Sequence, residues 1–464
     1  MAFVLSSLNL RLNSGLWLSE CHNQKMPGSS AFIATPSMSA ARAHDIAESF
    51  DLRKLPADFY ANPYPVYDVL RAEQPVRRMP DGSYFLTRYA DLVAVYRDAQ
   101  TFSSDKKVEF GPKYQVHSAL FEHHTTSLVF NDPPLHSRVR KLIMGALARR
   151  SIDAMEPALV ALVNGLLDTI NAKGGGDLID DFAAAIPIDV IGNLLGVPQA
   201  DRVPLRGWSL AILGALEPQL SAAQLSAGNS AVTQFTAYLR HLVAERRRHP
   251  GNAQHDVLTR LIQGEGIDNQ LSESELLQNC IFILNAGHET TTNLIGNALV
   301  GLQEWPEQRH QLLKKIEHGT VDSVALDLDL AVDEFLRFES SNQLGNRRAL
   351  KACVIGDALL PQGALLTLCI AAANRDTAQF TEPSQLNLQR GDARLGEPPN
   401  RHLAFGFGIH QCAGLSLARL EGRIAIGQFL QRFPRYRLTA TPLRAGRARF
   451  RGFLSAPFAT DAND

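Results

Sequence analysis

The longest stretch of helical periodicity lies in the middle of the chain. From Pro134 to about Ile316 the pattern is mostly helical, and two turns interrupt it, GVPQADRVP and RRRHPGNAQHD. The longest helix of this stretch is expected from roughly Glu273 to Glu304, with a capping box before it, Ser272 and Glu275, and Pro306 after it. At about 1.5 Å per residue such a helix is about 48 Å long, so we expect it to cross the whole core.

Shorter elements flank this helical stretch. A Pro-Asp-Gly turn between short strands, followed by a helix, is expected over residues 75–98. Residues 101–130 have weak periodicity and predict a long, mobile loop with helical fragments, a kind of segment that is often functional. Short strands are expected over residues 347–376, and a helix directly after Cys412. The pattern predicts a mainly α fold with a small β part.

We expect residues 1–45 to form an extension that precedes the folded domain. The first twenty residues are mildly apolar, but they have neither a basic start nor a clean cleavage site for a targeting segment. We expect a disordered extension or a mis-assigned start, with Met26 and Met38 as alternative starts. No repeat and no low-complexity linker divides the remainder, so residues 46–464 are expected to form one large domain.

Composition narrows the function classes. The net charge of -1 in 464 residues gives no electrostatic basis for binding nucleic acid. No uninterrupted apolar run reaches about 18 residues, so we expect no membrane span. A cytoplasmic location and a monomer are also expected. The five cysteines are odd in number and form no CxxC pair, which argues against a disulfide framework or a zinc site. One cysteine is then left to act chemically by itself.

Cys412 lies in the glycine-rich stretch FGFGIHQCAG, which has the form F-x-x-G-x-x-x-C-x-G. Glycines let backbone N–H groups approach a sulfur closely, and those groups together with the start of the following helix stabilise a thiolate. The alternative is a buried structural cysteine in a turn. The full spacing of Phe405, Gly408, Cys412 and Gly414 resembles the haem-binding loop of the cytochrome P450 family, of the soluble bacterial type.

The resemblance implies a haem enzyme whose iron protoporphyrin IX (haem b) lies between the long central helix and the cysteine loop, with Cys412 as the axial ligand of the iron. His410 fits the bacterial form of the motif, which implies a hydrogen bond to a haem propionate. Residues 50–458 are covered by the resemblance. The haem contacts that it implies are His136, Arg140, Ala286, Arg347, Phe405, Gly406, His410 and Gly414.

The middle of the long helix contains AGHETTT, residues 286–292. Glycine and threonine are poor helix formers, and threonine hydroxyls that bond back to preceding carbonyls can open a helix locally. A helix crossing that needs small residues is the alternative. The stretch fits the family pattern A-G-x-[D/E]-T-[T/S], which implies that Thr290 lies over the oxygen site and that Glu289 connects it to solvent. Such a pair would deliver two protons to the distal oxygen in a dry pocket.

The resemblance implies a role for two further pairs of charged residues. Glu334 and Arg337 share a helix face at i and i+3, which alone predicts only a weak surface pair. In the family, E-x-x-R implies a structural network behind the proximal haem face. His136 and Arg140, at i and i+4, resemble the helix along the haem edge, although a solvated basic face is the alternative. A further propionate partner is expected at Arg347, or at its neighbour Arg348.

The chain departs from the family pattern at Ser341, where proline is usual, and this leaves the pocket shape open. We expect an apolar substrate pocket formed by Phe121, Leu128, Phe282, Leu344 and Phe453. The group His117, His123, His124 and Lys113 is a candidate carboxylate site, but solvated loop charges are the preferred interpretation.

The expected function is oxygen activation and hydroxylation of a small hydrophobic compound, with O2 as co-substrate. Electrons would come from NAD(P)H through a ferredoxin or flavodoxin and its reductase. Arg138, Lys141, Arg419 and Arg423 are expected to form a basic patch for that partner. A peroxide-driven or rearranging enzyme of the same fold is the alternative, and a haem-binding sensor is a further one.

Overall fold

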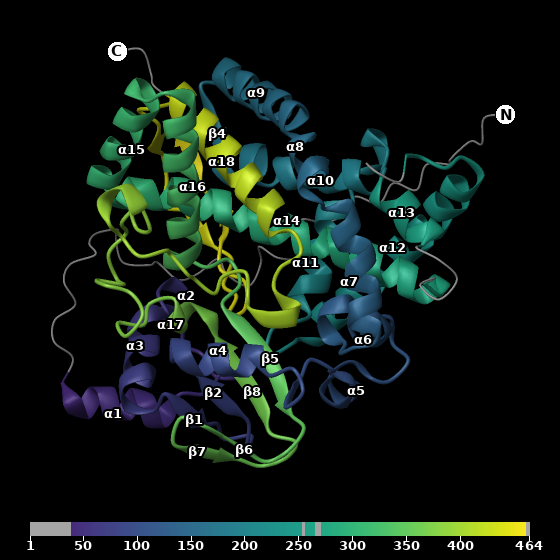
Figure 1. Ribbon diagram of the computed structural model, residues 1–464, viewed down its shortest axis with the longest axis vertical. Coiled ribbons are helices and arrows are strands. Elements are labelled where there is room, and N and C mark those ends of the chain that lie inside the picture. The colour runs from purple at the N-terminus through teal and green to yellow at the C-terminus, as the bar shows by residue number, and fades with distance from the viewer. Residues whose placement is uncertain (1–38, 253–255, 265–270, 461–464) are drawn as a thin grey trace. The chain divides into compact units, whose positions relative to one another are not determined.

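The computed structural model describes residues 39–252, 256–264 and 271–460 (Figure 1). The predicted extension over residues 1–45 falls outside these ranges, except for its last seven residues. Among the described residues we find no helix with the length and apolar content that a bilayer crossing requires.

Helices make up most of the described chain, and their bounds agree with the predicted mainly α fold. The α-helices are α1 (Ala40–Ser49), α2 (Ala57–Ala61), α3 (Tyr64–Glu73), α4 (Tyr89–Arg97), α5 (Lys107–Tyr114), α6 (Ala119–Thr126), α7 (Leu135–Ala146), α8 (Arg149–Asp153), α9 (Glu156–Lys173), α10 (Ala185–Leu194), α11 (Leu205–Gly214), α12 (Ala222–Arg248), α13 (Val257–Gln263), α14 (Glu273–Glu304), α15 (Pro306–His318), α16 (Val321–Phe338), α17 (Ile370–Ala373) and α18 (Leu415–Arg432). Short helical turns are η2 (Leu128–Phe130), η3 (Leu178–Ala183), η4 (Gln199–Asp201), η6 (Ala393–Leu395) and η7 (Gly408–His410).

The strands form small sheets at the edges of the helical body. They are β1 (Val76–Arg78), β2 (Tyr84–Leu86), β3 (Phe102–Ser103), β4 (Gly175–Asp177), β5 (Leu344–Ala349), β6 (Cys353–Ile355), β7 (Ala358–Leu360), β8 (Leu365–Cys369), β9 (Arg437–Leu438), β10 (Leu443–Arg444), β11 (Phe453–Ser455) and β12 (Pro457–Ala459). The largest sheet has the order β1-β2-β8-β5-β3, with β2 and β8 parallel and the other neighbours antiparallel. The predicted Pro-Asp-Gly turn joins β1 to β2.

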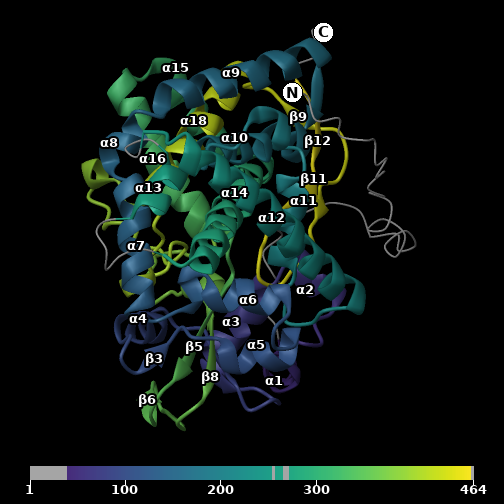
Figure 2. The same ribbon diagram turned by 90° about the vertical axis from the view of Figure 1, so that its right-hand side faces the viewer.

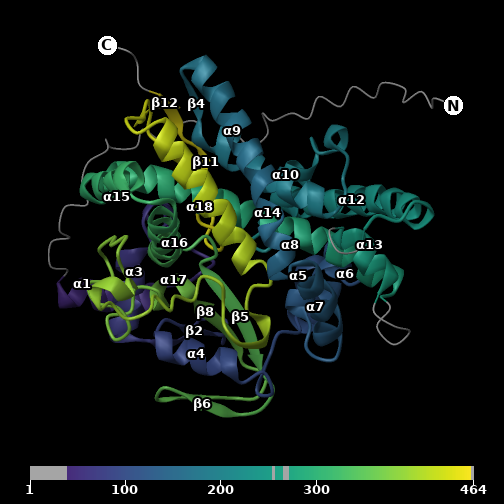
Figure 3. The same ribbon diagram turned by 45° about the horizontal axis from the view of Figure 1, so that its top comes forward.

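Helix α14 confirms the prediction of a long central helix. It begins after Ser272, and both hydrogen bonds of the predicted capping box with Glu275 are present. Most of its side chains are buried because α10, α11, α12, α16 and α18 all pack against it (Figure 2). Helix α18 crosses it directly after the cysteine loop, so the two predicted halves of the site are held by helices in contact (Figure 3).

The helical fragments predicted within residues 101–130 are confirmed, but the segment is not a long loop. The segment folds as β3, α5, α6 and η2, and it packs apolar residues into the main core, among them Phe110, Leu120 and Leu128. Aromatic stacking partly accounts for this order, since the ring centroids of Phe110 and Phe130 lie 5.2 Å apart. The weak periodicity arose because helices of eight residues each are too short to show a clear pattern.

Helix α18 carries an acid in the core. Glu421 is buried, its Oε2 has no hydrogen-bond partner among the described residues, and burial raises the pKa of its carboxyl to about 8. Its ordinary value is 4.5. Between pH 4.5 and about 8 the carboxyl of Glu421 is ionised in the unfolded chain but protonated in the folded one. The free energy of unfolding therefore falls as pH rises through this range. Below pH 4.5 the carboxyl is protonated in both states and does not change the stability.

We therefore expect Glu421→Gln to raise the melting temperature by about 2 °C or more at pH 8, because the amide has no proton to lose. Near pH 4.5 the difference between the variant and the unchanged protein should nearly vanish. Glu317→Gln, at an exposed glutamate, is the matched control. Thermal unfolding followed by circular dichroism at both pH values measures this, and an equal shift at both would contradict it.

Candidate functional site

Cys412 lies in a loop between η7 and α18 that backbone hydrogen bonds hold closed. Its N–H donates to the carbonyl oxygen of Phe405 at 2.8 Å, and the N–H of Gly406 donates to that of Leu403 at 2.8 Å. Gly406 and Gly408 have φ of +66° and +72°, which favour glycine. The loop therefore presents the sulfur from a fixed backbone.

The two motif glycines at 408 and 414 have different tasks. A Cβ on Gly408 would lie 2.2 Å from the carbonyl oxygen of Tyr96, so this glycine lets the loop pack against the end of α4. A Cβ on Gly414 would lie 4.0 Å from Cys412 Sγ. That is an ordinary contact, but the Gly414 amide forms a hydrogen bond to the sulfur that acts to lower the pKa of the thiol, so the predicted N–H approach belongs to Gly414 and Gly408 serves packing instead.

The surroundings of Cys412 contain groups that raise the pKa of its thiol and groups that lower it. Burial raises the pKa of the Cys412 thiol, while the Gly414 amide and the guanidinium groups of Arg140 and Arg419 act to lower it. Arg419 also lies over the ring of Phe405, with its guanidinium carbon 5.0 Å from the ring centroid. Cations and an amide donor therefore act on the thiol of a residue that stays partly accessible, as a ligand that must reach an iron requires.

Four predicted propionate partners gather beside this loop. The rings of His136 on α7 and His410 on η7 have centroids 4.1 Å apart, and Arg140 and Arg347 both act electrostatically on His410. The Nε2 atom of His410 is buried without a hydrogen-bond partner among the described residues. The structure thus brings together donors from α7, β5 and the loop that a pair of carboxylates would satisfy.

Strand geometry separates Arg347 from Arg348. Successive residues of β5 point to opposite faces. Arg348 turns to Glu109 of α5, with Nη2 2.9 Å from Oε1. Arg347 lies over the ring of Tyr96, at 5.1 Å from the centroid, on the side of the cysteine loop. The side chain of Arg347 therefore lies on the same side of β5 as Tyr96, and that of Arg348 on the other.

The middle of α14 keeps one face open although most of the helix is buried. Phe282, Ala286, Gly287 and Thr290 recur at helical spacing and are all partly or fully accessible. The Thr290 hydroxyl donates to the carbonyl oxygen of Ala286 at 2.7 Å, which is the predicted back-bond. A Cβ on Gly287 would lie 2.5 Å from the side chain of Ile191 on α10. At this position the small residue therefore serves a helix crossing, which was the alternative explanation for this stretch.

Glu289 has a partner that the sequence analysis missed. Its side chain is buried, and Oε1 pairs with Nη1 of Arg447, while Oε2 has no hydrogen-bond partner among the described residues. Burial raises the pKa of the Glu289 carboxyl, and the guanidinium of Arg447 opposes this. Arginines at 447, 449 and 451 follow the two-residue period of an extended chain, a signal that buried acids lie opposite them.

Ser341, the position where the chain departs from the family pattern, binds the same part of α14. Its hydroxyl donates to the carbonyl oxygen of Thr290 at 2.8 Å. A proline has no such donor, so this bond is specific to the serine. The segment before β5 is thereby attached to the helix at the residue that carries the candidate hydroxyl.

Glu334 and Arg337 form the centre of a buried network. Both side chains are fully buried and joined by two hydrogen bonds of 2.7 Å. Arg337 also donates to the carbonyl oxygens of Asn374 and Pro383, and Arg390 donates to Glu334 Oε2 at 3.1 Å. The alternative of a weak surface pair is excluded. Arg390 was missed because nothing in its local sequence marks it.

Known proteins match this architecture. The family model for cytochrome P450 matches residues 219–442. A biotin biosynthesis cytochrome P450 of Bacillus subtilis is 35% identical over 381 residues, covering 82% of this chain and 91% of the relative. The chain belongs to the cytochrome P450 family. It is accordingly a haem-dependent monooxygenase, and the family resemblance and the fold class predicted from the sequence are confirmed.

Two further relatives of this cytochrome P450 show the range of compounds that similar proteins handle. A vitamin D(3) 25-hydroxylase of Pseudonocardia autotrophica is 35% identical over 374 residues, covering 80% of this chain and 86% of the relative. The crystal structure of P450BioI with an acyl carrier protein ligated to hexadec-9Z-enoic acid has a TM-score of 0.79 and 34% identity, and covers 87% of this chain and 99% of that one.

The residues of this P450 fit a haem. The loop offers one partly accessible cysteine for iron, and the buried Nε2 of His410 lacks a partner among the described residues that a propionate oxygen would supply. Arg140 and Arg347 add two cations for the two propionates. The accessible stripe of Ala286 and Thr290 leaves a face of α14 uncovered by protein, as a ring on that side requires.

The predicted pocket residues do not form one cluster. Leu128 and Phe453 are buried in the main helical core, and Phe121 and Phe282 pack against it half-buried. Leu344 belongs to a separate core under the large sheet. Phe282 lies on α14 and the other three on elements around it, whereas Leu344 lies on β5.

The predicted basic patch is largely neutralised by acids of the chain itself. Arg419 donates to Asp333 at 2.7 Å, and Arg423 lies 3.3 Å from Glu156. Arg138 pairs with Glu275. The net positive charge on this face is therefore smaller than the sequence predicts.

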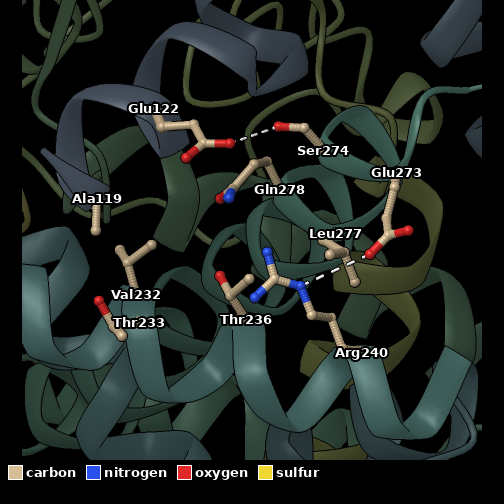
Figure 4. A pocket seen from close by; sticks show the side chains of 10 residues that line it. All are labelled: Ala119, Glu122, Val232, Thr233, Thr236, Arg240, Glu273, Ser274, Leu277 and Gln278. Atoms are coloured by element: carbon tan, nitrogen blue, oxygen red, sulfur yellow. Dashed lines mark hydrogen bonds and ion pairs between the residues drawn. The ribbon is translucent and has the colours of Figure 1, made fainter. Parts of the chain in front are cut away.

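A separate open pocket of about 360 Å³ lies between α6, α12 and the first turns of α14 (Figure 4). Two polar contacts span its lining, one between Glu122 and Ser274 and one between Arg240 and Glu273. None of the predicted site residues lines it.

Proposed function

We propose that this P450 hydroxylates a small apolar compound with O2 and externally supplied electrons, and that the Cys412 thiolate is the protein ligand of the haem iron. One observation carries the proposal: a buried carboxylate, Glu289, directly precedes the Thr290 hydroxyl on the accessible face of α14. An acid next to an alcohol is the arrangement that proton delivery to oxygen requires. One named relative is a vitamin D(3) 25-hydroxylase and another was solved with an acyl carrier protein ligated to hexadec-9Z-enoic acid, which supports an apolar substrate.

Each proposed site residue has a physical task. Bound haem supplies oxygen activation at its iron. Gly414 donates its N–H to the sulfur, Phe405 shields it, and Gly406 shapes the loop. Thr290 Oγ1 holds a proton at the open face of α14. Glu289 Oε2 takes up the second proton, since this atom lacks a hydrogen-bond partner among the described residues. The buried Glu334–Arg337 network holds the fold and has no part in the chemistry.

His136, Arg140, Arg347 and His410 are proposed to bind the two propionates. They bear N–H groups from separate elements and are close to one another. Electrons are proposed to come from NAD(P)H through a separate ferredoxin or flavodoxin and its reductase. The acid partners of Arg419 and Arg423 imply that surface charge alone contributes only moderately to that docking.

The proton task of Thr290 makes a direct prediction. In Thr290→Ala we expect the amount of product per NAD(P)H consumed to fall about tenfold while NAD(P)H consumption continues, because proton delivery is lost but oxygen binding is not. Product and hydrogen peroxide are measured together. Thr292→Ala is the control, because that hydroxyl makes the same back-bond, at 2.9 Å to His288, but is buried.

Unchanged coupling in Thr290→Ala would exclude the proton task. Turnover with hydrogen peroxide alone and none with a ferredoxin system would favour the peroxide-driven alternative.

A further inference from the structure

The acid of the candidate pair is attached to a segment from the far end of the chain. Nη1 of Arg447 lies 2.5 Å from Oε1 of Glu289, and the two side chains are 12% and 6% exposed. Arg447 belongs to the segment between β10 and β11, which runs beside α11 (Figure 2). The pair is largely buried, so neither charge can be removed without leaving the other unbalanced inside the protein.

The guanidinium of Arg447 also binds α11. Its Nη2 donates to the carbonyl oxygen of Leu210 at 3.2 Å. The backbone next to it is fixed as well, because the carboxylate of Glu217 accepts from the N–H groups of Ala448 at 2.9 Å and Arg449 at 3.2 Å. A guanidinium is planar and rigid, so it cannot turn away from the acid of α14 without giving up its bond to α11.

This attachment uses one oxygen of the acid and leaves the other. Oε1 of Glu289 is taken by Arg447, whereas Oε2 is buried and has no hydrogen-bond partner among the described residues. A free carboxylate can turn and offer either oxygen, but a carboxylate held at one oxygen offers the other in a fixed position. The next residue, Thr290, carries the candidate hydroxyl on the partly accessible face of α14.

The charge balance of Glu289 depends mainly on this arginine. Burial raises the pKa of the Glu289 carboxyl, Arg447 lowers it, and Glu217 beyond the end of α11 raises it slightly further. Arg206 of α11 has an acid partner of its own. His288, the neighbour on α14, has its pKa lowered to about 3 mainly by burial, so it carries no charge at neutral pH. Without Arg447 the effect of burial would be unopposed, and the carboxyl would keep its proton to a higher pH.

We propose that Arg447 is a positioning residue for proton delivery: its guanidinium fixes Glu289 by Oε1, ties the acid to α11, and so leaves Oε2 as the atom that takes up a proton. This inference rests on the proposed function and adds a residue to it. Oε2 gains a proton from solvent and passes it on toward the Thr290 hydroxyl, after which the carboxylate is restored. Arg447 keeps its charge throughout and acts only through Glu289.

The test measures the ratio of water to hydrogen peroxide that the haem-loaded enzyme forms from O2, with NAD(P)H, a ferredoxin and its reductase. Oxygen and peroxide are followed per NAD(P)H consumed, and no substrate is needed. Arg447→Gln is expected to lower the ratio about tenfold, because the acid is no longer held in place. It should also move the midpoint of the pH profile upward by about one unit, because no cation then opposes the burial of Glu289.

Arg202→Gln is the matched control. The side chain of Arg202 is 9% exposed, pairs with Asp189 at 2.9 Å and donates to the carbonyl oxygen of Val197 at 3.0 Å. It therefore also links an acid to a backbone carbonyl, and its loss should lower stability without changing the ratio or the midpoint. Arg447→Lys retains the charge without the rigid guanidinium, so it should keep the midpoint and lower the ratio less than glutamine does.

A second measurement does not require turnover. Arg447→Gln raises the pKa of Glu289 in the folded chain alone, so the loss of stability that it causes should be greater at about pH 8 than at about pH 5. At the lower pH the carboxyl is nearer to being protonated in both states, and the arginine matters less. In a Glu289→Gln background the loss should be equal at both pH values. Urea unfolding followed by circular dichroism measures all four proteins.

Three results would overturn the inference: an unchanged midpoint in Arg447→Gln, an equal shift in Arg202→Gln, or a loss of stability that does not grow with pH. If Arg447→Gln does not fold, Arg447→Lys takes its place, and a ratio equal to that of the unchanged protein would overturn the positioning role. An unchanged ratio in both Arg447→Gln and Thr290→Ala would instead place the failure in the proton task of the proposed function.

Discussion

Replacing Cys412 with alanine is expected to abolish the red-shifted absorption of the ferrous carbonyl adduct and to lower turnover at least ~100-fold. The red shift reports electron donation from a thiolate to the iron, and no other cysteine lies in the haem loop. The substitution should remove the iron ligand without unfolding the loop. Backbone hydrogen bonds such as that from Cys412 N–H to the carbonyl oxygen of Phe405 close the loop, and alanine retains them.

Cys353→Ala is the matched control for this prediction. Cys353 is partly accessible and lies on β6, in a separate two-stranded sheet. Its variant should keep both the spectrum and the turnover. Circular dichroism separates loss of the ligand from loss of the fold. A Cys412→Ala protein that retains the red-shifted band would show that another residue binds the iron.

Glu334→Gln is expected to destabilise the folded protein by about 3–5 kcal/mol, because it leaves two buried guanidinium groups without their counter-ion. Both side chains of the Glu334–Arg337 pair are fully buried, and Arg390 shares the same carboxylate at 3.1 Å. The amide retains one acceptor oxygen but loses the charge, so the variant tests charge balance with little change of volume. Urea unfolding, followed by circular dichroism and by the haem absorption, measures the loss.

An exposed ion pair provides the comparison. Arg149 and Asp153 lie 3.6 Å apart with side chains 92% and 63% exposed, and Asp153→Asn is expected to change the free energy of unfolding by less than about 0.5 kcal/mol. If Glu334→Gln cannot be purified in folded form, Arg390→Gln should still show a loss of about 1–3 kcal/mol. A Glu334→Gln midpoint equal to that of Asp153→Asn would contradict a structural role for the network.

Several site residues were predictable because local spacing alone defines them. The loop around Cys412 and the stretch around Thr290 are each contiguous, so the residues that act together are already neighbours in the chain. Helix α14 was predictable with both ends because its capping box and the following proline are local signals. Glu334 and Arg337 share a helix face for the same reason.

Other features depend on contacts between distant segments. Arg390 reaches Glu334 across 56 positions, and Arg447 reaches Glu289 across 158. Residues 101–130 were predicted as a loop with helical fragments, because the contacts that pack these short helices against the main core come from distant segments and leave no local pattern. The histidines at 123 and 124 are buried for that reason, whereas polarity alone predicted exposure.

The sequence by itself determined the family, the mainly α fold, the cysteine of the loop and the acid–alcohol pair, since each depends on residues close together in the chain. Only the tertiary structure decided that Arg347 and Arg348 point to opposite faces of β5, and which acids neutralise the predicted basic patch. The reason is physical: the burial and electrostatic balance of a charged group are set by whatever the fold packs against it, and those neighbours come from remote segments.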